Sequence, residues 1–166
     1  MTLDRRHFLG LGGAAAIAAG LAPVLAARGG PAAAAPSFPY TLSDAQWRER
    51  LTREQYGVLR REGTERPYSS PLNEEHRKGI YACAGCAQRL FSSSAKFDSG
   101  TGWPSFWQPL AGAVGETQDR SFGMTRVAVH CANCGGHLGH VFDDGPRPTG
   151  LRYCMNGVAM NFIPQA

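Results

Sequence analysis

The sequence has little charge, and no strong excess of either sign. Charged residues make up 18% of the 166 residues, and the formal net charge is +4. Residues 1–36 carry Arg5, Arg6 and Arg28 against Asp4, so half of the net charge lies in that segment. The remainder is close to neutral, which argues against a basic face for nucleic acid. We therefore expect no nucleic-acid partner.

Long solvated helices are not indicated either. The chain contains 21 glycines and 11 prolines, a composition typical of turns and short strands and unlike that of a coiled coil or a helical bundle. A doubled Cys-x-x-Cys is the single internal repeat. At this length we expect one domain with one core.

The first residues have the pattern of an export leader. The pair Arg5-Arg6 precedes Phe8-Leu9, and a weakly apolar Gly/Ala-rich run extends from Leu11 to Ala27. This order resembles a twin-arginine leader. A retained transmembrane anchor is the alternative, although the run is only just long enough to span a bilayer. A cleaved leader predicts an exported protein, in the periplasm or elsewhere outside the cytoplasm, with the twin-arginine export machinery as a partner.

The rest of the chain is predicted to be one domain after a linker. We assign residues 1–36 to the signal segment and the start of the linker, residues 37–42 to the remaining linker, and residues 43–166 to the domain. Two capping boxes, Ser43-Asp44-Ala45-Gln46 and Thr52-Arg53-Glu54-Gln55, each precede apolar residues at helical spacing and predict two short helices.

Beyond Gly63 the apolar pattern favours strands. We expect them at 79–82, 124–129 and 151–163, with turn clusters between them. The expected architecture is two helices packed on a mostly antiparallel β domain.

Five cysteines divide into a group of four and one more. Cys83 with Cys86, and Cys131 with Cys134, form two Cys-x-x-Cys knuckles, which is the ligand spacing of a structural zinc site. The metal would join two distant hairpins of a larger sheet and stabilise the fold. Cys154 is then left without a partner and is a candidate nucleophile.

The knuckles leave a second interpretation open. We expect Gly85 and Gly135 to let the backbone curl around the ion. Disulfides are the alternative in an exported chain, but a bond within one Cys-x-x-Cys is typically a redox couple. The twin-arginine route carries folded proteins, which suits a domain that binds its metal before export.

The residues around Cys154 favour reactivity. Strand geometry places Arg152, Cys154 and Asn156 on one face, with Tyr153 and Met155 on the other. A neighbouring guanidinium favours thiolate over thiol. A buried structural cysteine is the alternative interpretation.

Two further segments carry candidate functional side chains. His137 and His140 lie three apart just after the second knuckle, where they can act as proton donors, or else supplement the metal site or cap a turn. Trp103 follows a Gly-rich turn and is suited to lining a small apolar pocket, with an ordinary buried tryptophan as the alternative.

Five blocks of the chain, in order, resemble the type B methionine sulfoxide reductases, from about Ser43 to Pro164. The blocks are Gly79-Ile80-Tyr81 with Cys83-x-x-Cys86, Ser99-Gly100-Thr101-Gly102-Trp103-Pro104-Ser105-Phe106, Cys131-x-x-Cys134, His137-Leu138-Gly139-His140-Val141-Phe142-Asp143-Asp144-Gly145-Pro146 and Arg152-Tyr153-Cys154. The resemblance implies a mainly β fold of two antiparallel sheets, a zinc-braced, barrel-like (Mss4-like) β domain with short N-terminal helices.

The resemblance also implies an activity. Family members reduce the R epimer of methionine sulfoxide, free or in proteins, to the thioether. Carried over, Cys154 attacks the sulfoxide sulfur and ends as a sulfenic acid, while His137 and His140 bind the sulfoxide oxygen and supply the proton. In an exported protein, this reaction repairs oxidised exported proteins.

The remaining roles follow from the same resemblance. Arg152 would hold Cys154 as a thiolate, Asn156 would position the polar network, and Trp103 would pack against the substrate methyl. A pocket with donors on one wall and an indole on the other can distinguish the two epimers of a sulfoxide. The four knuckle cysteines would hold the zinc.

Two departures from the family pattern affect these expectations. Many members have a resolving cysteine where this chain has Thr101, so an external reductant, either a thioredoxin-like protein or a small thiol, must act on Cys154. Met155 and Gly157 stand where Ile and Ser are common, and neither supplies the expected chemistry.

Two other classes of protein remain alternatives. A zinc-ribbon binding module explains the four cysteines but gives no purpose to the histidine pair or to Cys154. A different enzyme on a similar zinc-braced fold is the second, because a fold does not fix a function.

Overall fold

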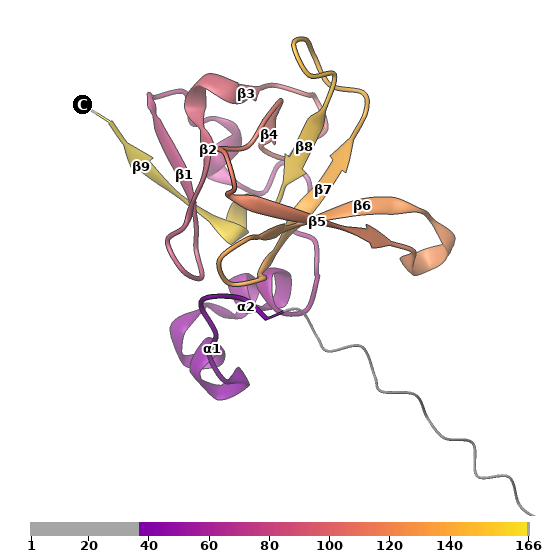
Figure 1. Cartoon of the computed structure of the whole chain (residues 1–166). Helices are drawn as coiled ribbons and strands as arrows, with labels where there is room; N and C mark the ends of the chain where they lie inside the picture. Colours follow the sequence, from indigo (N-terminus) through magenta and orange to yellow (C-terminus); the bar gives the residue numbers. More distant parts are fainter. Residues whose placement is uncertain (1–36, 166) are drawn as a thin grey trace, which may run out of the picture. The chain divides into compact units, whose positions relative to one another are not determined.

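The computed structural model describes residues 37–165, so the predicted leader and the start of the linker, residues 1–36, lie outside the described residues. Two short α-helices precede nine strands (Figure 1). Within the described part of the chain, no helix is long and apolar enough to cross a membrane.

Both predicted helices are confirmed at their capping boxes. Helix α1 spans Asp44–Arg50 and helix α2 spans Arg53–Leu59, and each has a complete capping box at its N-terminus. The side chains of Ser43 and Thr52 each accept a hydrogen bond from the backbone N–H three residues on. The apolar residues that follow each box are buried: Trp47, Leu51, Tyr56 and Leu59.

The nine strands form two antiparallel sheets, as expected. The three-stranded sheet has the order β2-β1-β9, with β1 at Gly79–Cys83, β2 at Arg89–Ser92 and β9 at Met160–Pro164. The six-stranded sheet has the order β3-β4-β8-β7-β6-β5, with β3 at Lys96–Phe97, β4 at Ser105–Phe106, β5 at Val114–Asp119, β6 at Arg126–Cys131, β7 at His137–Phe142 and β8 at Arg152–Met155. Four short 3₁₀ turns connect elements: η1 at Pro71–Asn73, η2 at Ser93–Ala95, η3 at Ser121–Gly123 and η4 at Gly157–Ala159.

The expected strand at 151–163 is not continuous. It is divided into β8 and β9 by the turn η4, and the two halves belong to different sheets. Asn156 therefore lies past the end of β8, before η4, and not on the strand face beside Cys154. The alternation holds within β8 itself, where Tyr153 and Met155 are buried and their neighbours are half-buried.

Aromatic side chains join the two sheets. The ring of Phe91 on β2 stacks on Phe106 of β4 with centroids 4.4 Å apart, and Tyr81 of β1 meets Phe106 edge-on at 4.9 Å. All three rings are fully buried, so this contact makes one core from two sheets. Strand β4, which pairs with the strand β8 of the candidate nucleophile, is thereby fixed against the smaller sheet.

Candidate active site and metal centre

The four knuckle cysteines converge on one point. Their sulfur atoms all lie within 4.8 Å of one another, with Cys83 and Cys134 separated by 3.7 Å and Cys86 and Cys131 by 3.6 Å. Four sulfurs at about 2.3 Å from a tetrahedral zinc ion would be about 3.8 Å apart. A disulfide needs about 2.05 Å, and all four thiols are free. The donor set and spacing therefore fit zinc, with a role in stability.

The knuckles come from hairpins in different sheets, not from one larger sheet as expected. Cys83 ends β1 of the smaller sheet and Cys131 ends β6 of the larger. Hydrogen bonds from the neighbouring thiols, led by Cys131, raise the pKa of Cys83 and of Cys134. Four thiols packed this closely need a cation to be ionised together. A bound metal would therefore join the two sheets.

The glycine prediction for the knuckles is half right. Gly135 has a φ of 68°, and Ala87 takes the equivalent left-handed conformation with a φ of 60°. Each N–H bonds back to the first carbonyl of its knuckle, Ala87 to Cys83 and Gly135 to Cys131. Gly85 has no positive φ and lies close to Trp47 instead, since an added Cβ would be 3.3 Å from the ring.

The N-terminal segment covers the knuckles. Arg50 donates a hydrogen bond of 2.7 Å to the carbonyl of Gly85, and Arg60 donates one of 3.1 Å to the carbonyl of Cys134. The ring of Phe38 occupies the space above Gly135, and the Tyr40 N–H bonds to a carbonyl of the second knuckle at 2.9 Å. The end of the expected linker is therefore packed on the metal centre.

Cys154 lies in β8, between β4 and β7 of the larger sheet. Across the strands it is paired with Ser105 on one side and His140 on the other. Its side chain is half-buried, and the Thr101 hydroxyl lies 3.8 Å from its sulfur. Thr101 in turn bonds to Ser99 at 2.8 Å. The sulfur thus has the Thr101 hydroxyl beside it, with Ser105 and His140 at the paired positions of the neighbouring strands.

The two histidines face each other, although residues three apart on a regular strand point to opposite faces of the sheet. The pairing of β6 with β7 shifts between Val129 and His130, which leaves Leu138 as an extra residue. Such a bulge changes the alternation by one, and the rings of His137 and His140 come to 5.3 Å between centroids. The bulge places both imidazoles on one side of β7.

His137 is buried with an unsatisfied nitrogen. It is 6% exposed, and its Nε2 has no hydrogen-bond partner among the described residues. Burial, with a smaller contribution from His140, lowers the pKa of His137 to about 4. A neutral imidazole nitrogen left unpaired in a buried place is available to a bound ligand.

Asp119, which no sequence pattern indicated, fixes His140. Its carboxylate lies 2.9 Å from Nε2 of His140 and 2.7 Å from Arg126. Hydrogen bonds led by Ser121 lower the pKa of Asp119 well below its usual range. An ionised carboxylate only accepts hydrogen bonds, so the imidazole must carry a proton on Nε2. The tautomer of His140 is thereby determined.

Arg152 lies two residues before Cys154, on the same face of β8, and it also pairs with a carboxylate. Its guanidinium makes two hydrogen bonds to Asp144, of 2.8 and 2.7 Å. The pKa of Arg152 is raised first by Asp144 and also by Cys154. The guanidinium is therefore oriented by Asp144. Asp144 is a second residue that the sequence analysis missed.

Trp103 and Asn156 meet through a third residue, Glu65. The indole N–H of Trp103 donates to the Glu65 carbonyl at 3.2 Å, and the Glu65 N–H donates to the Asn156 side-chain oxygen at 2.9 Å. Asn156 also donates to the carbonyl of Leu138 at 3.0 Å. Trp103 is half-buried and Asn156 is buried. The six predicted catalytic and substrate residues thus lie on β7, on β8, at the position between β8 and η4, and in the loop before β4.

Comparison with known proteins identifies the family. The SelR domain model matches residues 51–164. The peptide methionine sulfoxide reductase MsrB of Agrobacterium fabrum is 58% identical over 123 residues, which is 74% of this chain and 91% of that protein. The proteins of the same name from Leifsonia xyli and Leptospira interrogans are 56% and 53% identical, over 74% and 76% of this chain and 90% and 97% of their own lengths.

The chain belongs to the SelR-domain family, that of the type B methionine sulfoxide reductases. The prediction of an enzyme, a peptide methionine sulfoxide reductase, is confirmed.

Proposed function

We propose that the protein reduces the R epimer of methionine sulfoxide, in polypeptides or free, through a sulfenic acid on Cys154. The observation that carries this proposal is the place of Cys154, directly across the sheet from His140 and outside the four-cysteine cluster. The Cys154 sulfur attacks the sulfoxide sulfur, the oxygen passes to Cys154 as S–OH, and the thioether is released. The oxygen gains the thiol proton, so the atoms balance.

The histidines would handle the sulfoxide oxygen. The buried Nε2 of His137 lacks a partner among the described residues and is free to bond to that oxygen. His140, whose Nε2–H is held by Asp119, would accept the Cys154 thiol proton on Nδ1 and pass it to that oxygen, which makes the oxygen a competent leaving group. Arg152 favours the thiolate of Cys154 because its charge lies on the same face of β8.

Selection of the R epimer would come from opposite walls of the site. The histidines form the polar wall, and the Trp103 indole forms the apolar wall for the substrate methyl. Only one arrangement around the stereogenic sulfur can place the oxygen at the histidines, the methyl at the indole and the sulfur at Cys154. Asn156 would hold the polar wall in place, because its side-chain amide donates a hydrogen bond to the carbonyl of Leu138, which lies between the two histidines on β7.

Regeneration of Cys154 would need an external thiol. Thr101, not a cysteine, stands beside the Cys154 sulfur, and the other four cysteines form the metal cluster. Two thiols of a thioredoxin-like protein or of a small reductant would convert the sulfenic acid to thiol and water and would themselves become a disulfide.

We further propose that zinc occupies the cluster and that the enzyme acts outside the cytoplasm. The four-sulfur geometry supports zinc. The paired arginines and the Gly/Ala-rich run of residues 5–27 support a twin-arginine leader, and hence repair of oxidised exported proteins. Replacement of Arg5-Arg6 by two lysines should retain the protein in the cytoplasm, as measured by cell fractionation. Unchanged export of that variant would contradict the leader.

The activity is tested with separated R and S epimers of a methionine sulfoxide peptide and dithiothreitol as reductant. The zinc-loaded protein should form methionine from the R epimer alone, and Cys154→Ser should form none. Cys86→Ser should lose zinc and stability, which separates the metal role from the catalytic one. Turnover that persists in Cys154→Ser would exclude Cys154 as the nucleophile.

A further inference from the structure

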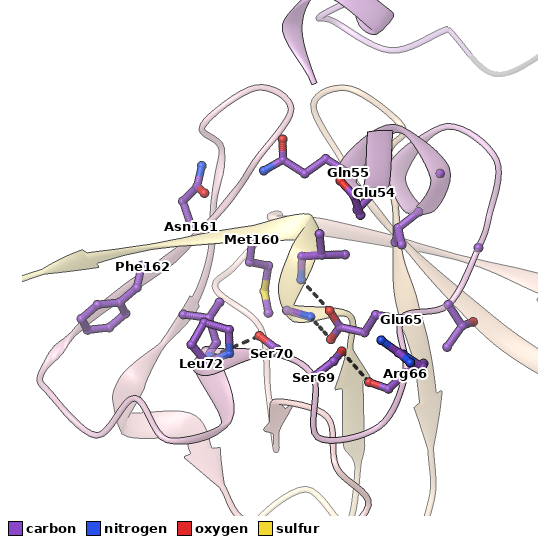
Figure 2. A pocket seen from close by; sticks show the side chains of 17 residues that line it. Glu54, Gln55, Glu65, Arg66, Ser69, Ser70, Leu72, Met160, Asn161 and Phe162 are labelled. Atoms are coloured by element: carbon purple, nitrogen blue, oxygen red, sulfur yellow. Dashed lines mark hydrogen bonds between the residues drawn. The ribbon is translucent and has the colours of Figure 1, made fainter. Parts of the chain in front are cut away.

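A cavity of about 750 Å³ lies behind the turn that follows Cys154. It is bounded by α2, the loop of residues 63–72, η4 and β9 (Figure 2). Leu72, Met160 and Phe162 contribute apolar side chains to its wall. Glu65 points into this wall from the loop, and Figure 2 shows its carboxylate bonded to η4. The residue therefore lies between the cavity and the active site.

Glu65 makes four hydrogen bonds, two through its carboxylate and two through its peptide groups. Its carboxylate accepts from the backbone N–H groups of Gly157 at 2.5 Å and Val158 at 2.9 Å. Its own N–H and C=O bond to Asn156 and to the Trp103 indole, as described above. Glu65 is thus bonded at once to the turn after Cys154, to the predicted polar network and to the predicted methyl wall.

The placement of the Glu65 carboxylate has a desolvation cost that its hydrogen bonds offset only in part. Burial raises the pKa of Glu65, and the hydrogen bonds from Val158 and Gly157 lower it by less. A carboxylate in this half-buried place therefore depends on those two bonds. An exposed side chain could cap a short turn without that cost, so capping η4 does not by itself account for the placement of Glu65.

The loop is also pressed closely against η4. A Cβ added at Gly157 would lie 1.9 Å from the Ser70 hydroxyl oxygen and 3.4 Å from the Glu65 carboxylate. A side chain at position 157 would therefore require Ser70 and η4 to move apart.

We infer that Glu65 is a positioning residue for the reduction, one that holds Trp103 and Asn156 at fixed places relative to Cys154. This inference rests on the proposed function, because it assigns both residues to the substrate site. The carboxylate fixes the loop to η4, and the peptide groups of residue 65 then set the indole and the amide. Loss of the carboxylate leaves Cys154 and the histidines in place but lets the methyl wall move.

The test uses Glu65→Gln, which keeps the shape of the side chain but places an amide N–H₂ against a backbone donor. Glu54→Gln is the matched control, since Glu54 lines the same cavity and is exposed. Methionine formed in a single turnover from the R-sulfoxide peptide is measured without added reductant. We expect Glu65→Gln to slow this rate about tenfold and Glu54→Gln to stay within about twofold of the parent.

Three readouts separate positioning from a general structural role. Zinc content and the rate of Cys154 alkylation by iodoacetamide should be unchanged in Glu65→Gln. In a Trp103→Phe background, the added effect of Glu65→Gln should fall below about twofold, because coupled residues are not additive. Exchange of the Trp103 indole proton, followed by NMR, should be faster in Glu65→Gln and unchanged in Glu54→Gln, whatever the activity.

The outcomes are distinct. A parental rate and parental indole exchange in Glu65→Gln would overturn the positioning role. So would a tenfold loss that persists with Trp103→Phe while indole exchange stays parental, or one that is accompanied by loss of zinc. A parent protein that forms no methionine from the R epimer would overturn the proposed function instead. Indole exchange would then still decide whether Glu65 holds Trp103.

Discussion

At the scale of single residues, Thr101 determines what happens to Cys154 after the reaction. Its hydroxyl lies 3.8 Å from the sulfur, and a thiol in its place would need only a small movement to reach a disulfide distance of about 2.05 Å. We expect Thr101→Cys to lose two thiols after one turnover, as a disulfide with Cys154. The parent should lose one, as a sulfenic acid. Thiol titration and mass spectrometry measure both.

Ser99→Cys is the matched control for that substitution, because Ser99 contacts Thr101 and Ser105 rather than Cys154. It should gain a thiol but form no disulfide with Cys154 on turnover. A sulfenic acid that survives in Thr101→Cys would mean that the loop holds residue 101 away from the thiol.

Ala87 offers a test of knuckle strain. It takes a left-handed conformation with a φ of 60°, which costs a non-glycine residue about 1 kcal/mol. Ala87→Gly should therefore stabilise the zinc-loaded protein by about 0.5 kcal/mol after the entropy cost of glycine. Urea unfolding measures it. Ala84→Gly, in the same knuckle without a positive φ, should instead lower stability.

At the scale of elements, the N-terminal segment acts as a cover for the metal centre. Arg50 at the end of α1 and Arg60, the residue after α2, each donate a hydrogen bond to a knuckle carbonyl. Phe38 lies over Gly135 with its ring edge-on to His130 at 5.5 Å. Three of the four cysteines are buried beneath these elements and Cys86 is half-buried.

We expect Phe38→Ala to loosen this cover. Loss of the ring removes about 1–2 kcal/mol of burial, so zinc transfer to a colorimetric chelator should become several-fold faster. Ile163→Ala, which removes an exposed apolar side chain from β9, should leave the transfer rate unchanged. Equal rates in parent and Phe38→Ala would show that Phe38 packs without protecting the metal.

Elements with a local cause could be predicted from the sequence, and those with a distant cause could not. Each capping box, at Ser43 and at Thr52, marks the start of its helix by four consecutive residues. The Cys-x-x-Cys spacing likewise marks the cysteine cluster. The turn η4 at the break between β8 and β9 is bonded to Glu65, a residue 92 positions away from Gly157 in sequence. Asp119 and Asp144 likewise have no pattern of their own, because their roles arise only from pairing with His140 and Arg152.

At the scale of the whole molecule, the burial of His137 makes stability depend on pH. Its pKa is lowered to about 4 by burial, while an unfolded histidine titrates near 6.5. As pH falls below about 6.5, His137 becomes protonated in the unfolded chain but stays neutral in the folded chain. The free energy of unfolding therefore decreases down to about pH 4. At pH 5 this amounts to ~2 kcal/mol.

His137→Gln should remove this contribution. Between pH 7.5 and pH 5, the unfolding free energy of the parent should therefore fall by ~2 kcal/mol more than that of the variant. Urea unfolding at both pH values measures it, and acid effects on the thiolates cancel because both proteins share them. An unchanged difference would place His137 in a more solvated state than its burial indicates.

The pairing of the first strand with the last has a consequence for biosynthesis. Gly79 of β1 is partnered by Pro164 of β9, so the smaller sheet cannot close until nearly the whole domain has left the ribosome. Contacts between such distant positions form slowly. Until then β1, which ends in a metal-binding cysteine, has an open edge. A nascent chain of this protein therefore passes through a stage in which its cysteines have been synthesised but the sheet that buries them has not yet formed. Chaperones or early metal binding have their greatest effect during that stage.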